Sequence, residues 1–366
     1  MNKKINNITL AVIALLFIFI QYGLKNKEIK VKSPYYNEMI EASTKMKNMS
    51  AEIKSERIRR GIEIDKSLDI NETGLIGEEW SGITTTLGNL ESKRTSTNPD
   101  FAALMIKLFK EKGLKKGDII AANISSSFPA LNLSLIAAAD TLGLNAIMVN
   151  SVGASTYGGN IENFTYLDME NHLFSKGMIQ NRSRGFSLGG IGDIGREFED
   201  EIKEKIIEKN KGYGLHFFYN ENLEKNIEER YSYFVKESNN KIKAFVNIGG
   251  NLLAIGDSVD IIVNSKVLLD KNTNMKKGWV GKFLKDEIPV FYLLNLKGIA
   301  TAYNLPFDQS NLQNKTISDI YFEKNGNIWN YLIIVIFLVF ILKTIFMKKN
   351  KKIYEKYWVY WKKMLL

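Results

Sequence analysis

The stretch DIIAANISSSFPALNLSLIAAADTLGLNAIMVNS, residues 118–151, decides the fold. An apolar strand, 118–124, stops at three serines, and the segment 129–143 is predicted as a helix because proline opens it and glycine closes it. A second apolar strand, 145–150, follows directly. A strand, a helix and a strand in succession predict two parallel neighbours in one sheet.

The same alternation continues on both sides of this stretch. Asn98 and Pro99 begin a predicted helix that stops at Gly113, and apolar strands are predicted at 242–248 and 288–295. We therefore expect an α/β fold with a doubly wound, mainly parallel sheet, a Rossmann-like layer sandwich whose ligands bind beyond the carboxyl ends of the strands. Turns rich in Ser, Gly or Asn are predicted at that edge: Ser125–Ser127, Ser151–Ser155, Gly249–Asn251 and Leu296–Gly298.

Residues 33–60 are predicted as a helix, with Ser33 as its cap and Pro34 in its first turn. Four apolar side chains fall on one stripe of this helix: Met39, Met46, Met49 and Ile53. We expect a stalk or packing helix that leads out of a membrane, followed by a linker.

Two long apolar segments, 5–24 and 325–342, lie near the ends of the chain. Each is long enough to cross a hydrocarbon core of about 30 Å. Lys3 and Lys4 give the first segment the basic start of a signal peptide, but its apolar stretch is too long and lacks a small-residue cleavage pattern. We therefore predict one N-terminal and one C-terminal transmembrane helix in the cell membrane.

Basic residues after the second segment set the predicted orientation, because such flanks stay cytoplasmic. Only Glu355 offsets the lysines there: Lys343, Lys348, Lys349, Lys351, Lys352, Lys356, Lys362 and Lys363. With two spans both termini are then cytoplasmic, residues 33–324 are extracytoplasmic, and the tail meets anionic lipid. Four lysines after the first segment argue more weakly for the opposite orientation: Lys25, Lys27, Lys30 and Lys32.

The net charge of +10 belongs to the membrane flanks. Residues 1–32 and 343–366 together carry about +12, which leaves the middle of the chain at about −2. This distribution argues against nucleic acid as a partner. The chain has no cysteine, and no histidine or carboxylate cluster has metal-ligand spacing, so we expect neither disulfides nor a metal site.

These features predict five parts of the chain: a transmembrane anchor and flank (1–32), a stalk or packing helix and linker (33–72), an extracytoplasmic α/β domain (73–324), a transmembrane helix (325–347) and a basic cytoplasmic tail (348–366). The α/β domain has the length of one large lobe or two smaller ones, the second from about residue 180.

Five stretches carry a resemblance to a known family: ITTTLGNLESKRTSTNPDFAAL (83–104), SSSFPALN (125–132), SVGAS (151–155), FTYLDME (164–170) and SLGGIGDIGR (187–196). In order and spacing they resemble the poly-gamma-glutamate system protein family, whose members are found alongside the membrane-bound machinery that makes and exports this polymer. The resemblance implies a role in that system and partners among its synthase and export proteins, without an assigned activity. Ser126 stands where the family is expected to have glycine.

The serine turn, Ser125, Ser126 and Ser127, is the sharpest local feature. Between a strand and a helix that starts at Pro129, the hydroxyls and the free N–H groups of the first helical turn face one point, which predicts an anion site for a carboxylate or phosphate. The alternative is that the serines only cap the helix.

A serine nucleophile, Ser125 or Ser127, needs a base within hydrogen-bond reach. The two histidines are His172, one helical turn after Asp168, and His216, in the apolar stretch GLHFFY. Neither falls in a recognisable catalytic pattern, and no G-x-S-x-G elbow surrounds the serines. A lysine such as Lys93 is an alternative base that the spacing does not single out.

Gly190-x-Gly192-x-x-Gly195 fits a dinucleotide fingerprint as a string and leads into a predicted helix at 196–209. The preceding segment, RSRGFSL, is a poor parallel strand, so we interpret the stretch as a glycine-rich loop with Asp193 as a helix cap. We expect no cofactor.

Cations near these turns form the predicted carboxylate site together with the serine turn: Lys93, Arg94, Arg182, Arg184 and Arg196, with Asp193 of the glycine-rich loop and with Gly249, Gly250 and Asn251 at the next turn. Arginine binds carboxylates through two parallel hydrogen bonds, and poly-gamma-glutamate presents one carboxylate per residue. The alternative is that Lys93 and Arg94 are solvated or paired with Glu91.

The sequence thus predicts an accessory component of poly-gamma-glutamate synthesis or export that binds the polymer or the synthase complex. One alternative is a gamma-glutamyl hydrolase or transferase with Ser125 or Ser127 as its nucleophile. Another is a membrane scaffold without a ligand site.

Overall fold

The computed structural model describes residues 29–256, 266–273, 275, 277–312 and 318–325, together with residues 15, 18, 332, 334–339, 358, 360–362 and 364. The chain divides into two compact units, one formed by residues 34–321 and one by the segments that flank it.

The larger unit is built on a seven-stranded sheet. From one edge to the other, its strands are β7 (His216–Phe217), β6 (Ser183–Ser187), β4 (Asn145–Ser151), β3 (Ile119–Ser125), β8 (Ile242–Ile248), β10 (Val290–Leu293) and β9 (Leu268–Leu269). All neighbours are parallel except β9, which runs antiparallel to β10. The predicted α/β class with a mainly parallel sheet is confirmed.

The order of the strands reverses beside β3. From β3 the chain passes through β4, β6 and β7 toward one edge, and then returns to β8 on the other side of β3. The carboxyl ends of β3 and β8 therefore flank a topological switch point, where open α/β sheets bind ligands. In β3, Ser125 is paired with Ser151 of β4, and Asn123 is paired with Asn247 of β8.

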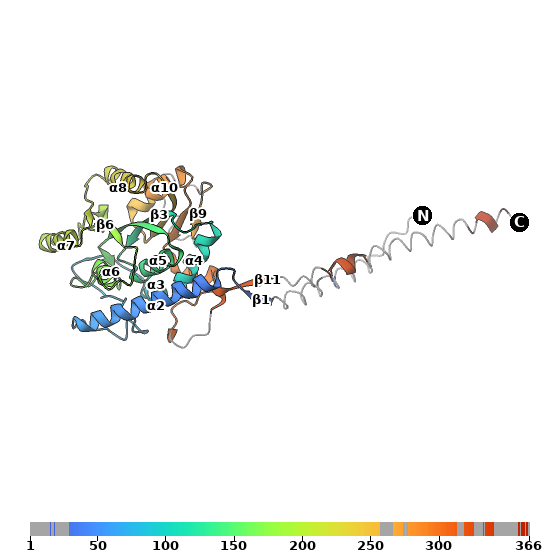
Figure 1. The fold of residues 1–366 in the computed structure, drawn as a ribbon, viewed down its shortest axis with the longest axis horizontal. Coiled ribbons are helices and arrows are strands. Elements are labelled where there is room, and N and C mark those ends of the chain that lie inside the picture. Colours follow the sequence, from blue (N-terminus) through green and yellow to red (C-terminus); the bar gives the residue numbers. More distant parts are fainter. Residues whose placement is uncertain are drawn as a thin grey trace. The chain divides into compact units, whose positions relative to one another are not determined.

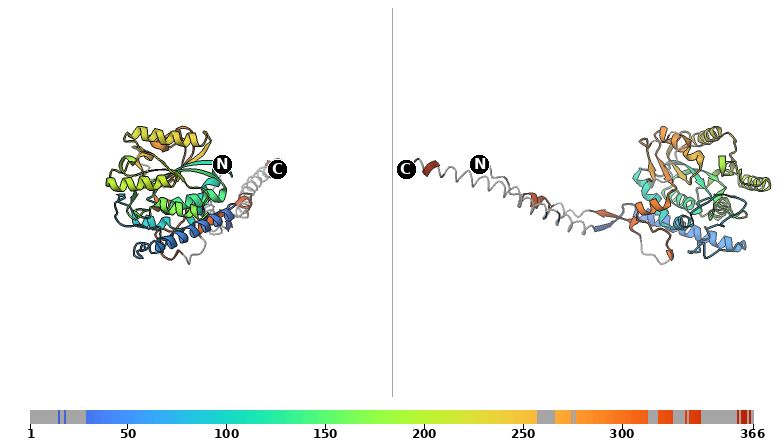
Figure 2. Two further views of the ribbon diagram at one scale, coloured as in Figure 1. Left: turned by 60° about the vertical axis from the view of Figure 1, so that its left-hand side comes forward. Right: turned by 180° about the vertical axis from the view of Figure 1, so that it is seen from behind.

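Helices cover both faces of the sheet (Figure 1), and Figure 2 shows these layers from two further sides. On one face, α2 (Tyr36–Arg59), α4 (Asp100–Glu111) and α5 (Pro129–Leu142) pack together. On the other lie α8 (Leu223–Glu237), α9 (Leu252–Ile255) and α10 (Gly278–Lys285). The core on this second face includes Phe234, Phe245, Trp279 and Phe283.

Further elements complete the larger unit: β2 (Thr84–Thr86), α3 (Leu90–Ser96), β5 (Ala154–Ser155), α6 (Tyr166–Ser175), η1 (Ile191–Asp193), α7 (Asp200–Gly212), α11 (Leu296–Ala302) and η4 (Asp319–Tyr321). Strands β2 and β5 pair in parallel as a separate two-stranded sheet.

Local sequence explains several helix ends. Pro129 begins α5, and Gly143, with a φ of 65°, ends it in the left-handed conformation, as predicted. Helix α2 begins at Tyr36, after the predicted start at Ser33, and Tyr35 is its N-cap. Its predicted apolar stripe is buried. Because α2 packs against α4 and α5, it is a packing helix of the domain and not a stalk.

The segment around residue 185 differs from expectation. Although RSRGFSL is polar for a parallel strand, Ser183–Ser187 form β6 between β4 and β7. A Cβ at Gly185 would lie 2.6 Å from the Phe218 ring, so glycine lets that ring pack on the strand. Strands β6 and β7 extend the common sheet within one compact unit, so no second lobe begins near residue 180. The next helix, α7, starts at Asp200, later than predicted.

The smaller unit contains an antiparallel pair of strands, β1 (Ile29–Lys32) and β11 (Phe322–Asn325). Most residues of the predicted transmembrane segments and of the basic tail lie outside the described residues. Within the described part of the chain, no helix combines the length and the apolar character that crossing a membrane requires.

Candidate functional site

A cavity of about 550 Å³ lies at the carboxyl edge of the sheet. Residues from five segments line most of it: 85–93, 125–128, 151–155, 190–197 and 250–252. The first four of these segments overlap stretches that carry the family resemblance. The segment 296–298, predicted as a turn, forms the start of α11 and does not line this cavity.

The three serines of the predicted anion site do not face the same point. Ser125 and Ser127 line the cavity, and the Ser125 Oγ accepts a hydrogen bond from the Ser127 N–H at 3.1 Å. Ser126 is fully buried, and its Oγ donates to Asn150 Oδ1 at 3.0 Å. The N-cap of α5 is Phe128 and makes no side-chain capping bond, so the capping alternative is wrong.

Lys93, on α3, projects into this cavity although only 2% of the residue is exposed. Its Nζ donates to the backbone oxygen of Ser127 and, at 2.6 Å, to Ser155 Oγ, and it lies 4.2 Å from the centre of the Phe128 ring. Burial lowers the pKa of Lys93 from 10.5 to about 7. No carboxylate of the described residues forms an ion pair with it.

Ser155 was not singled out from the sequence. It stands at the end of β5, opposite Thr86 of β2, and its N–H donates to Ser127 Oγ at 3.0 Å. The pairing of β2 with β5 brings Ser155 to Lys93. The sequence signals were that Ser155 ends a turn predicted at the carboxyl edge and that both positions lie in stretches of the family resemblance.

The predicted arginines do not converge on the serine turn. The Arg94 guanidinium holds Asp308 in two hydrogen bonds of 2.6 Å and does not line the cavity. Arg182 lies 4.2 Å from the centre of the Phe174 ring, and Arg184 pairs with Glu237 at 3.5 Å. Arg196 is exposed and does not line the cavity either. The alternative interpretation paired Arg94 with Glu91, but Arg94 forms its ion pair with Asp308. It also left Lys93 solvated, but Lys93 is buried.

Asp193 is a buried acceptor and not a helix cap. It lies in the glycine-rich loop with a φ of 66°, and neither it nor its partner Arg230 has an exposed side chain. Its Oδ2 accepts from Arg230 Nη2 at 2.5 Å, and its Oδ1 accepts from Ser151 Oγ and Asn251 Nδ2, each at 2.8 Å. Gly190 of the same loop lines the cavity.

Arg230, on α8, completes this network and was missed from the sequence. Its guanidinium lies 4.4 Å from the centre of the Trp279 ring and 5.2 Å from that of Phe218. Its Nη1 donates to Asn123 Oδ1 at 3.1 Å, and Asn123 in turn donates to Asn247 at 2.9 Å. The ends of the central strands are therefore tied to α8 through buried polar groups.

The turn after β8 was predicted to lie at the site, and the structure shows why glycine occupies position 249. Gly249 has a φ of 102°, and a Cβ there would lie 2.9 Å from the Ser125 Cβ. Gly250 and Asn251 line the cavity. Asn251 also caps α9, because its Oδ1 accepts from the Leu253 N–H at 2.9 Å.

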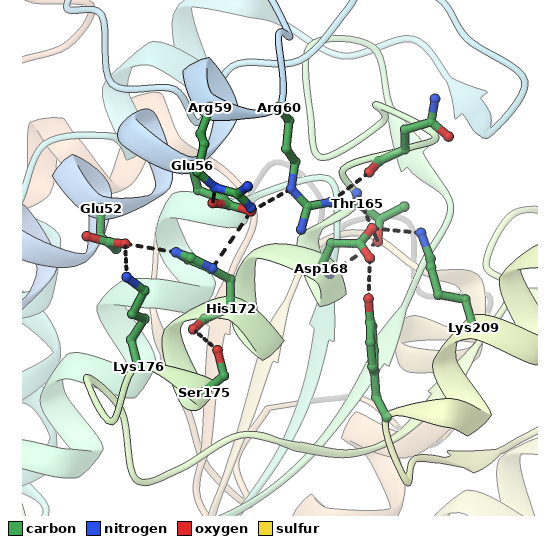
Figure 3. Close-up of polar contacts among 12 residues, drawn as sticks. Glu52, Glu56, Arg59, Arg60, Thr165, Asp168, His172, Ser175, Lys176 and Lys209 are labelled. Carbon is green, nitrogen blue, oxygen red and sulfur yellow. Dashed lines mark hydrogen bonds and ion pairs between the residues drawn. The ribbon is translucent and has the colours of Figure 1, made fainter.

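Both histidines have partners elsewhere. Figure 3 shows His172 of α6 against Glu52 and Glu56 of α2, and its Nε2 lies 2.8 Å from Glu52 Oε1. His216, in β7, stacks on Tyr233 with ring centroids 5.5 Å apart. Within the described residues, no group of three or more His, Cys, Asp or Glu side chains is placed to hold a metal ion.

Neither a family model, nor a curated protein, nor a solved structure matches the chain, so no relative supplies a function for this cavity.

Proposed function

We propose that the cavity binds the carboxylates of gamma-glutamyl chains, and that the protein is an accessory component of poly-gamma-glutamate synthesis or export at the cell membrane. Lys93 is the observation that carries this proposal. It is a buried amine that faces the cavity, and among the described residues no carboxylate pairs with it. Buried charges are normally paired, and a ligand carboxylate supplies the missing partner.

The size of the site limits the ligand. One lysine in a cavity of about 550 Å³ suits a short stretch or an end of the polymer rather than a long polyanion. The stretches of the family resemblance that surround the cavity support the link to this polymer. In this proposal the domain lies on the extracytoplasmic side, beside the membrane-bound synthase and export proteins, and the basic tail meets anionic lipid.

Binding calorimetry with gamma-glutamyl oligomers of defined length tests the proposal on the full-length protein in detergent micelles. We expect saturable binding that weakens with added salt. Because a carboxylate is held by the protonated amine, and burial places the pKa of Lys93 at about 7, the affinity should fall as the pH rises through that value. An oligomer with its carboxylates converted to amides is the ligand control and should not bind.

Two neighbouring substitutions provide a matched pair of variants. Lys93→Met should weaken binding by about thirtyfold or more, because the loss of a desolvated charge contact typically costs about 2 kcal/mol or more. Arg94→Gln removes the same charge from the same helix, but Arg94 is held by Asp308 outside the cavity, so the affinity should not change. Equal weakening by both variants, or no binding to the wild type, contradicts the proposal.

A further inference from the structure

We propose that Ser155 and Lys93 act as nucleophile and general base, and that the cavity hydrolyses gamma-glutamyl amide bonds. The substrate class rests on the function proposed above, whereas the pair itself rests on the geometry of the described residues.

The backbone around Ser155 holds its hydroxyl at the cavity wall. Parallel pairing with β2 fixes β5, and the Ser155 N–H donates to Ser127 Oγ at 3.0 Å. The Ser155 Oγ then lies 2.6 Å from Lys93 Nζ, within the reach that proton transfer needs. Both residues line the cavity, so a ligand there meets the hydroxyl and the amine together.

Three of the other serines that line the cavity have different hydrogen-bond partners. Ser125 Oγ accepts from the Ser127 N–H, and Ser127 Oγ accepts from the Ser155 N–H. Ser151 Oγ donates to Asp193, which Arg230 holds. Among the described serines that line the cavity, Ser155 is the one whose hydroxyl is hydrogen-bonded to a basic side chain. The geometry therefore favours Ser155 over Ser125 and Ser127 as the nucleophile.

Lys93 has the surroundings of a lysine base. A lysine accepts a proton only in its neutral form, and burial favours that form by removing the amine from water. No carboxylate of the described residues pairs with Lys93 to hold the proton on it, and burial lowers its pKa to about 7. Serine–lysine pairs are an established variant of the serine–histidine arrangement.

Gly88 leaves room beside the pair. A Cβ at this position would lie 2.9 Å from Ser155 Oγ and 3.0 Å from Lys93 Cε. The loop from Leu87 to Asn89 lines the same cavity, so glycine lets this backbone approach the pair closely.

Hydrolysis through this pair has two halves. Lys93 Nζ takes the proton of Ser155 Oγ as that oxygen bonds to the amide carbon, the C–N bond breaks, and Nζ passes the proton to the leaving amine. Water then gives a proton to Nζ as its oxygen bonds to the ester carbon, and the bond from that carbon to Oγ breaks. The proton returns to Ser155 Oγ, so amide and water yield a carboxylic acid and an amine.

Two readouts on the full-length protein in detergent micelles test the pair. One is the shortening of a gamma-glutamyl oligomer of defined length, and the other is labelling by a fluorophosphonate, which modifies activated serines without needing the polymer. We expect shorter fragments and, by mass spectrometry, the phosphonate on Ser155. Both rates should rise as the pH rises through about 7, because Lys93 must lose its proton to act as a base, and this trend is opposite to that of binding.

Two serine variants separate catalysis from binding. Ser155→Ala should reduce shortening by about 10³-fold or more while the oligomer still binds. The matched control is Ser126→Ala, since the Ser126 hydroxyl bonds Asn150 away from the cavity, and it should keep both rates. Oligomer binding without shortening and without labelling of Ser155 overturns the inference and leaves the proposed function standing. Labelling of Ser155 without oligomer binding supports the pair and overturns the proposed ligand.

Discussion

Two cations are buried at the carboxyl edge of the sheet, and the fold surrounds them differently. Arg230 pairs with Asp193 at 2.5 Å, and neither side chain is exposed to solvent. Lys93 is 2% exposed, but its hydrogen-bond partners are a hydroxyl and a backbone oxygen. Arg230 is therefore neutralised within the protein, whereas Lys93 lines a cavity and no carboxylate of the described residues compensates its charge.

This difference shows why burial alone does not identify a functional charge. Burial lowers the pKa of both side chains, but the nearby Asp193 carboxylate acts in the opposite direction on Arg230. Asp193 also accepts hydrogen bonds from Ser151 and Asn251, so its charge and both of its carboxylate oxygens have partners within the protein, which is what we call a closed network. A closed network stabilises the ends of the strands, while a buried amine that faces a cavity is free to meet a ligand or a proton.

The largest expected effect comes from opening the closed network. Arg230→Met should lower the free energy of unfolding by about 3–5 kcal/mol, because it leaves Asp193 buried without its cation. Urea unfolding of the full-length protein, followed by circular dichroism, measures this change.

The double variant Arg230→Met, Asp193→Asn removes both charges and should recover most of that loss, since a neutral pair needs no compensation. Asparagine also tolerates the φ of 66° at this position. A single variant as stable as the wild type would contradict the structural role of the pair.

Replacing Lys93 should have the opposite effect on the free energy of unfolding, because its charge has no carboxylate partner among the described residues. Its pKa falls from 10.5 in model compounds to about 7 in the folded protein. Each unit corresponds to about 1.4 kcal/mol, so the buried charge costs several kcal/mol near neutral pH. Lys93→Met removes that cost but also two hydrogen bonds, and we expect a net stabilisation of about 1–2 kcal/mol at about pH 7.

The dependence of this gain on pH checks its cause. Between about pH 7 and 10.5 the unfolded chain keeps the Lys93 proton and the folded protein releases it, so the stability of the wild type rises with pH relative to the variant. The advantage of Lys93→Met should therefore shrink across this window in urea unfolding at a series of pH values. An advantage that stays constant across this window would show that burial of the charge is not its origin.

Much of the fold followed from local sequence, because strand, turn and helix signals lie within short stretches. The strand predicted at 242–248 coincides with β8, and the helix that Pro129 opens ends at Gly143 as expected. Strand β6 was missed because its polar sequence carries no strand signal. Contacts from elsewhere in the chain hold it in place: it pairs with β4 and β7, and the Phe218 ring packs against Gly185.

The sequence predicted where the candidate site lies, but not which side chains contact one another there. Three of the four turns predicted at the carboxyl edge line the cavity, since the topology of the sheet brings them together. Lys93 and Arg94 looked equivalent in the sequence, yet adjacent positions on α3 point one toward Ser155 and the other toward Asp308. Arg230 lies in a helix rich in charged residues, where a buried arginine looks like a surface one.

The smallest predicted effect comes from the serine turn, where a hydroxyl that is bonded inside the protein can be compared with one that lines the cavity. Ser126→Ala should lower the free energy of unfolding by about 1–2 kcal/mol, because Asn150 Oδ1 loses its donor inside the protein. It should not change the affinity for gamma-glutamyl oligomers, since Ser126 does not line the cavity. Ser127→Ala should instead weaken binding, because Ser127 lines the cavity and its hydroxyl accepts the Ser155 N–H. If Ser126→Ala weakened binding and Ser127→Ala changed only the stability, the division of the serine turn into a buried structural hydroxyl and a cavity-lining hydroxyl would be wrong.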